Sequence, residues 1–237
     1  MVVAIILLAL GAIMSSIFIV SKVTNYSLKT IILKTVASLF FVALGIYCAI
    51  IVPSANTAFK VLVIMGLVFG LLGDIFLGFK YTTTKTKNIW IMLGLFAFAF
   101  GHISYLVSLF VGFYVPGNVL FAILPFVTSS IITTIFMIVS RKLGVVLSKK
   151  LFPFAIFYIF CLTSMVSSAF YMCLLHKFAI TTLIMFFCGA FCFMCSDFML
   201  TGAYFKPGQR SKAYMATYSV FYYLAQFAIA FALFFLL

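Results

Sequence analysis

Residues 61–79 read VLVIMGLVFGLLGDIFLGF, an apolar stretch interrupted by a single carboxylate, Asp74. About 20 apolar residues in a helix suffice to cross the hydrocarbon core of a bilayer. The stretch therefore predicts a transmembrane helix that carries an acid into the membrane. A second stretch, FCFMCSDFMLTG at 191–202, repeats the pattern with Asp197, and these two aspartates are the only acidic residues of the 237-residue chain.

The rest of the chain has the same character. It is 67% hydrophobic and 7% charged, with a mean hydropathy of +1.37, whereas a soluble domain carries roughly 25% charged residues. The sequence predicts an all-α, polytopic membrane helix bundle that forms a single integral domain over residues 1–237. Its eight predicted spans are 2–20, 31–52, 59–79, 89–112, 118–140, 151–174, 178–201 and 213–236.

The net charge of +13 is a signal of topology rather than of nucleic-acid binding. Thirteen of the fifteen basic residues flank alternate connections, and only Lys60 and Lys177 fall on the other side. Short cytoplasmic loops collect Lys and Arg, so both termini are expected outside the cytoplasm, in the cell membrane of a bacterium or the endoplasmic reticulum of a eukaryote. Anionic lipid headgroups are the expected partners of this charge. The thirteen are Lys22, Lys29, Lys34, Lys80, Lys85, Lys87, Arg141, Lys142, Lys149, Lys150, Lys206, Arg210 and Lys212.

The two aspartate segments suggest an internal duplication. GDIFL at 73–77 matches SDFML at 196–200, four predicted spans later. An even offset preserves orientation, so the repeat would be parallel, with halves 1–115 and 118–237. Chance similarity between two helices rich in Leu and Phe is the alternative.

The depth of the aspartates favours a function. With a rise of 1.5 Å per residue, Asp74 lies roughly 9 Å before Lys80 and Asp197 roughly 13 Å before Lys206. A charge in the membrane costs at least about 2.5 kcal/mol and marks a functional site by default. Gly66, Gly70 and Gly78 recur on the face of Asp74, and such a small-residue stripe permits close helix packing. Asp74 is therefore expected to face the bundle, next to a pocket.

Further polar side chains recur at helical spacing in two other spans. Side chains that lie three or four residues apart on a helix share one face. We regard these side chains as candidates for substrate binding. Their structural alternative is packing with a satisfied polar end or hydrogen bonding between helices. The candidates are His102 and Tyr105 in the fourth span and Tyr218, Tyr222 and Gln226 in the eighth, where Tyr214 begins the same four-residue ladder.

The sequence predicts no metal ion and no cofactor. Cys192 and Cys195 form a CxxC, but they lie within one apolar helix without a second CxxC, so packing is preferred over zinc or redox chemistry. A three-histidine zinc site cannot be assembled, because the chain has only His102 and His176.

Four blocks of the sequence resemble the lysoplasmalogenases, also called YhhN-like proteins. The blocks are GLVFGLLGDIFL at 66–77, FAFGHISYLVSLF at 98–110, FCFMCSDFML at 191–200 and TYSVFYYLAQFAIA at 217–230. They follow the order and spacing of that family, within its architecture of eight spans. Lys34 resembles the family's lysine at the start of the second span and is by this resemblance a further substrate-binding candidate, although the segment LKTVASLF lacks the proline expected after it.

The resemblance implies hydrolysis of the vinyl ether bond of a lysophospholipid, which releases a fatty aldehyde and glycerophosphocholine or glycerophosphoethanolamine. Such chemistry needs an acid that protonates carbon and an anion that stabilises the oxocarbenium ion, a division of labour known from paired carboxylates. The apolar bundle favours a protonated acid. Because Ser196 could favour the ionised form of its neighbour Asp197, the sequence favours Asp74 as the acid and Asp197 as the base or stabiliser.

Two other classes stay open from the residues alone. A transporter also places carboxylates between duplicated halves, as proton or cation carriers. A scaffold or sensor would use them as hydrogen-bond partners between helices. Release of aldehyde by the purified protein separates the enzyme from both.

Overall fold

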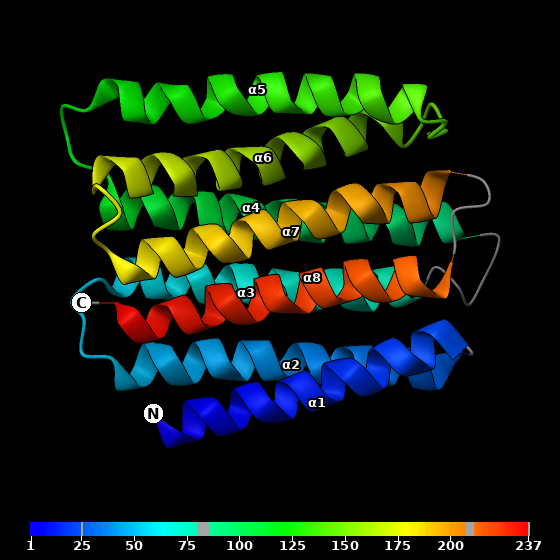
Figure 1. Cartoon of the computed structure of the whole chain (residues 1–237), viewed down its shortest axis with the longest axis horizontal. Coiled ribbons are helices and arrows are strands. Elements are labelled where there is room, and N and C mark those ends of the chain that lie inside the picture. Colours follow the sequence, from blue (N-terminus) through cyan, green and yellow to red (C-terminus); the bar gives the residue numbers. More distant parts are fainter. Residues whose placement is uncertain (25, 80–85, 207–210, 237) are drawn as a thin grey trace.

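A computed structural model gives the structure of the protein, and it describes residues 1–24, 26–79, 86–206 and 211–236. Eight long helices run side by side along one axis in this described part (Figure 1). They are α1 (Val2–Thr24), α2 (Leu28–Ile51), α3 (Thr57–Phe79), α4 (Lys87–Phe113), α5 (Val119–Lys142), α6 (Phe152–Leu175), α7 (Thr181–Phe205) and α8 (Lys212–Ala232), followed by the short 3₁₀ helix η1 (Leu233–Phe235).

All eight helices are long and apolar enough to cross a membrane. The prediction of an all-α polytopic bundle is thereby confirmed. The first predicted span ended too early, because α1 continues to Thr24. The polar residues Ser21 and Lys22, which appeared to end the span, instead find hydrogen-bond partners inside the bundle, on Thr30 and Ser219.

Both termini lie at one end of the bundle (Figure 1). The opposite end carries the connection from α1 to α2 and that from α5 to α6, where basic residues gather. Lys80, Lys85 and Arg210, which belong to the same predicted side, lie outside the described residues. Which end faces the cytoplasm stays a prediction.

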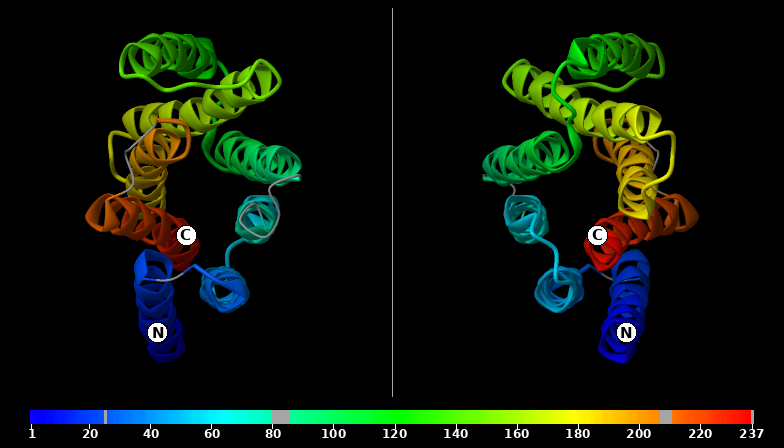
Figure 2. Two further views of the ribbon diagram at one scale, coloured as in Figure 1. Left: turned by 90° about the vertical axis from the view of Figure 1, so that its right-hand side faces the viewer. Right: turned by 90° about the vertical axis from the view of Figure 1, so that its left-hand side faces the viewer.

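The helices contact one another in two similar series. In the first half, α1 packs on α2, α2 on α3 and α3 on α4, and in the second half α5 packs on α6, α6 on α7 and α7 on α8. Between the halves, α4 packs on α6, and α8 packs on α1, α2 and α3. Seen along the bundle, α5 and α1 lie at its two extremities (Figure 2). The α4–α6 and α2–α8 contacts correspond to each other under a parallel duplication, whereas the α1–α8 contact has no equally extensive counterpart between α5 and α4 in the described part of the chain. The duplication stays a prediction.

The glycine stripe of α3 admits its neighbours at close range, as predicted. A Cβ on Gly66 would lie 2.3 Å from the ring of Tyr105 in α4, and one on Gly70 would lie 2.5 Å from the amide nitrogen of Gln226 in α8. Asp74, on the same face, is only 1% exposed. The stripe thus turns the aspartate into the bundle and brings α4 and α8 against it.

Candidate active site

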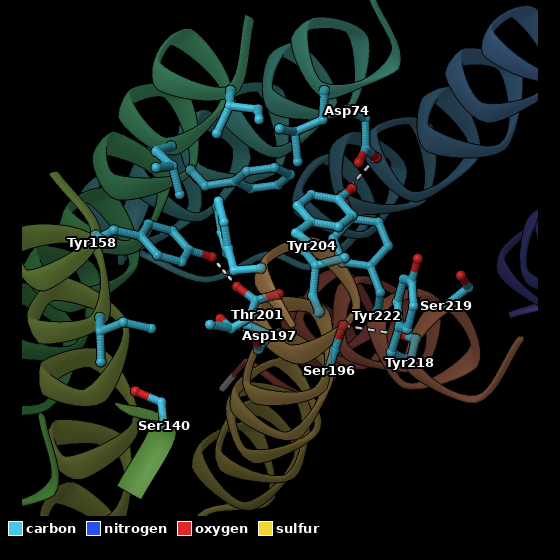
Figure 3. A pocket seen from close by; sticks show the side chains of 18 of the residues that line it. Asp74, Ser140, Tyr158, Ser196, Asp197, Thr201, Tyr204, Tyr218, Ser219 and Tyr222 are labelled. Carbon is cyan, nitrogen blue, oxygen red and sulfur yellow. Dashed lines mark hydrogen bonds between the residues drawn. The ribbon is translucent and has the colours of Figure 1, made fainter. Parts of the chain in front are cut away.

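A pocket lies between the helices, toward the end opposite the termini, and all eight helices contribute to its lining. Both aspartates are among the lining residues (Figure 3). Most of the other lining side chains are apolar, and the polar ones come mainly from α7 and α8. Concave, largely apolar sites with a few converging polar groups are typical of binding sites for small molecules.

Asp74 in α3 is surrounded by donors. Its Oδ1 lies 2.8 Å from Nζ of Lys34 in α2, which forms the one ion pair among the described residues. Its Oδ2 accepts hydrogen bonds from Ser38 Oγ at 2.5 Å and from the hydroxyl of Tyr222 in α8 at 2.6 Å. A cation and two hydroxyl donors favour the carboxylate anion.

Behind Tyr222, two further polar side chains form a chain of hydrogen bonds inside the bundle. Gln226 Nε2 donates to the Tyr222 hydroxyl at 3.2 Å, and the Tyr105 hydroxyl donates to Gln226 Oε1 at 3.1 Å. Both Gln226 and Tyr105 are buried. This chain orients the Tyr222 hydroxyl toward Asp74.

Asp197 in α7 has a different environment. The hydroxyl of Tyr158 in α6 donates a hydrogen bond to its Oδ2, and Nε2 of His102 in α4 lies 3.3 Å from the same hydroxyl. Asp197 is 4% exposed, and no basic side chain in the described part of the chain forms an ion pair with it. A buried carboxyl without a counter-ion is favoured in its neutral, protonated form.

Ser196 does not serve the neighbouring carboxyl. Its hydroxyl donates to the backbone carbonyl of Tyr218 at 2.9 Å, which ties α7 to α8 (Figure 3). The sequence-based expectation that Ser196 stabilises an ionised Asp197 is therefore wrong. The contact that Asp197 does make comes from a residue on another helix.

The structure separates the predicted site residues into two groups. Five of them line the pocket, and three lie behind it. The first group is Asp74, Asp197, Lys34, Tyr218 and Tyr222. The second group is His102, Tyr105 and Gln226. His102 contacts the lining residue Tyr158 and Gln226 contacts the lining residue Tyr222, whereas Tyr105 contacts Gln226.

Sequence reasoning missed three polar contributors. Ser38 lies one turn beyond Lys34, a spacing that places both on one face of α2, so this signal was available. Tyr158 is one of twelve tyrosines in the chain, without a motif that distinguishes it. Lys22 was assigned to the membrane surface, yet it lines the pocket.

No group of three His, Cys, Asp or Glu side chains suited to a metal ion occurs among the residues that the structure describes. The CxxC cysteines Cys192 and Cys195 are free thiols on α7. The polar side chains of the pocket instead form pairs and short chains with one another. The arrangement offers two carboxyl groups, several hydroxyl groups and the side-chain nitrogens of Lys22 and Lys34 to a bound molecule.

A comparison with protein families gives a match to the YhhN family over residues 29–233. The chain belongs to the YhhN family. No curated protein and no solved structure matches the chain. The YhhN match includes both aspartates together with Lys34 and Tyr158, whereas Lys22 lies before its first residue.

Proposed function

We propose that this YhhN family member hydrolyses the vinyl ether bond of lysoplasmalogens, releasing a fatty aldehyde and a glycerophospho alcohol. The observation that carries the proposal is the pair of carboxyl groups in one pocket, of which one has a cationic partner and the other does not. Membership of the family supports the same reaction class through the resemblance described above.

Vinyl ether hydrolysis requires both forms of a carboxyl group. The first step transfers a proton to the carbon that is β to the ether oxygen, which yields an oxocarbenium ion. Water then adds to this ion and gives a hemiacetal, and the hemiacetal collapses to aldehyde and alcohol. An acid is needed for the first step and an anion for the cation that follows, as in glycosidases.

In this proposal Asp197 is the acid and Asp74 the anion, the reverse of the assignment favoured by sequence alone. Asp197 has a tyrosine as its partner and no counter-ion, which suits a proton held at neutral pH. Asp74 is held by Lys34, Ser38 and Tyr222, which suits a carboxylate. The two environments divide the roles.

The proton count closes over one cycle. Asp197 gives its proton to the β-carbon, and Asp74 takes one from the water that attacks the oxocarbenium ion. In the collapse of the hemiacetal, Asp197 accepts the proton of the hemiacetal hydroxyl while Asp74 returns its proton to the departing glycerol oxygen. One water is consumed, one carbon–oxygen bond is broken, and both carboxyl groups regain their starting forms.

The lining of the pocket suits a lipid with one hydrocarbon chain. Apolar side chains from several helices line it beside the carboxyl groups, so the alkenyl chain would lie against apolar surface while the ether approaches the acids. These apolar side chains include Leu77, Leu95, Phe98, Phe136, Ile159 and Leu200.

The test is turnover by purified protein in detergent, with an alkenyl lysophospholipid in deuterium oxide. We expect aldehyde with one deuterium on the carbon next to its carbonyl, and no cleavage of the saturated alkyl-ether analogue. The aldehyde is trapped by reduction at once, and a product-only incubation sets the background from enolisation. A transporter or scaffold would release no aldehyde, and aldehyde without deuterium above background would exclude protonation of carbon.

A further inference from the structure

We propose that Lys22 forms a subsite for the phosphate group of the lipid substrate, at the end of the pocket farthest from the chain termini. This inference rests on the proposed function for the identity of the lipid. Its physical basis is independent of the catalytic step, because it concerns a cation that the proposed mechanism does not use.

Lys22 is held in place by α1 and α8. Its Nζ donates to Ser219 Oγ at 2.7 Å and lies 4.0 Å from the centroid of the Tyr218 ring. The ring of Phe18, one turn earlier, lies 5.6 Å from the same nitrogen. Cation–π contacts of this kind fix an ammonium group. All four side chains line the pocket.

The hydrogen bonding of this nitrogen leaves it donors for a ligand. An ammonium group has three N–H donors, and Ser219 takes one of them. Ser219 uses its own hydrogen toward the carbonyl of Met215, at 2.8 Å, so it acts as an acceptor for Lys22. The serine therefore orients the ammonium group and does not neutralise its charge.

The charges of the pocket point to an anionic ligand. The chain contains two acidic side chains, and the ion pair among the described residues joins one of them, Asp74, to Lys34. Lys22 forms no ion pair with a carboxylate in the described part of the chain. A cation in a largely apolar pocket is stabilised by an anion that accepts its hydrogen bonds. The phosphate group supplies such an anion in every glycerophospholipid.

The depth of Lys22 matches the position of that phosphate. Lys22 lies two residues before the end of α1, Asp74 five before the end of α3 and Asp197 eight before the end of α7. With a rise of 1.5 Å per residue, the carboxyl groups are roughly 4 to 9 Å deeper than Lys22. The glycerol backbone separates ether and phosphate by a comparable span. A lipid with its ether at the aspartates would thus present its phosphate to Lys22.

The test compares ligands with and without phosphate in three variants. Equilibrium binding of a saturated alkyl-ether lysophosphocholine and of the corresponding alkylglycerol is measured on the purified protein in detergent. We expect Lys22→Met to weaken binding of the phospholipid about tenfold or more, the size of a lost charged hydrogen bond, and to leave alkylglycerol binding unchanged. Lys22→Arg should retain phospholipid binding, because the charge at this position is kept. Lys29→Met, which removes an exposed lysine outside the pocket, is the matched control.

The outcomes separate this subsite from the reaction. Equal weakening of both ligands by Lys22→Met would mean that Lys22 only supports packing, and no weakening of either would mean that it touches neither; each result overturns the subsite. Lys22-dependent binding by a protein that releases no aldehyde from the alkenyl lipid would uphold the subsite and overturn the hydrolase. Aldehyde release without Lys22-dependent binding would uphold the hydrolase and overturn the subsite.

Discussion

Asp74 and Asp197 occupy corresponding places on α3 and α7, yet their neighbours differ. Lys34 lies six residues after Leu28, where α2 begins, and Tyr158 lies six residues after Phe152, where α6 begins. Each contacts the aspartate of the following helix, but one is a cation and the other a phenol. The difference between a cation and a phenol on the preceding helix, together with the Ser38 and Tyr222 donors at Asp74, is the basis of the proposed division into an anion and an acid.

The largest expected effect comes from removing either carboxyl group. Asp74→Asn and Asp197→Asn each preserve shape and remove acid–base capacity, so each should lower kcat by at least about 10²-fold. Turnover of the alkenyl lysophospholipid measures this effect. The elution volume of the purified variant and its helical content show whether it is folded. A folded variant with near-normal turnover would exclude the two-carboxyl mechanism.

The same two variants differ in stability if the comparison is right. Asp74→Asn leaves Lys34 without its counter-ion, and breaking a buried ion pair costs about 3 kcal/mol. Asp197→Asn loses no ion pair. The thermal unfolding midpoint in detergent should therefore fall more for Asp74→Asn. Equal midpoints would show that Lys34 does not depend on Asp74.

Removing the cation should have the next largest effect. Lys34→Met leaves Asp74 buried without a counter-ion, so the carboxylate that the mechanism needs becomes less favourable. We expect kcat to fall about tenfold to hundredfold, and Lys34→Arg to retain more activity than Lys34→Met. Combining Lys34→Met with Asp74→Asn should recover stability lost in either single variant, since the two side chains act as a pair.

Lys29→Met is the control for this series, because Lys29 lies on the same helix but is exposed and outside the pocket. If Lys34→Met matched this control in turnover, Asp74 would not act as an anion. The division of roles between the two halves would then be wrong, even with both carboxyl groups required.

Removing the hydroxyl group of Tyr158 or of Tyr222 should have smaller effects on kcat. Tyr158→Phe removes the hydrogen bond to Asp197, whereas Tyr222→Phe removes one of two hydroxyl donors to Asp74, which keeps Lys34 and Ser38. We expect about tenfold lower kcat for Tyr158→Phe and only a few-fold loss for Tyr222→Phe, since one neutral hydrogen bond contributes about 1 kcal/mol. A larger loss in Tyr222→Phe would reverse this ranking and point to direct substrate contact by Tyr222.

The sequence was sufficient for the spans and for the two acids, but not for their environments. Apolar runs have a length set by the bilayer, and an aspartate within such a run stands out. Tyr158 carries no such signal, because tyrosine is frequent in this chain and its contact with Asp197 arises from the packing of α6 on α7. Lys22 was grouped with surface charge, since only the packing of α1 on α8 brings it over Tyr218.

The smallest expected effect concerns His102, which the sequence analysis predicts as a substrate-binding residue. His102 does not line the pocket, and its ring packs edge-on against Phe193 with centroids 4.8 Å apart. Its Nδ1 is buried without a hydrogen-bond partner in the described part of the chain, and such an atom costs about 1 to 3 kcal/mol. His102→Phe keeps an aromatic ring at this position and removes that atom together with Nε2, whose contact with the Tyr158 hydroxyl is long at 3.3 Å. Stability should therefore be equal or higher. Since Tyr158 still donates to Asp197, we expect kcat within a few-fold of the wild type. A loss of about 10²-fold in the folded variant would mean that protons reach Asp197 through the imidazole, and that the second half uses a relay which the first half lacks.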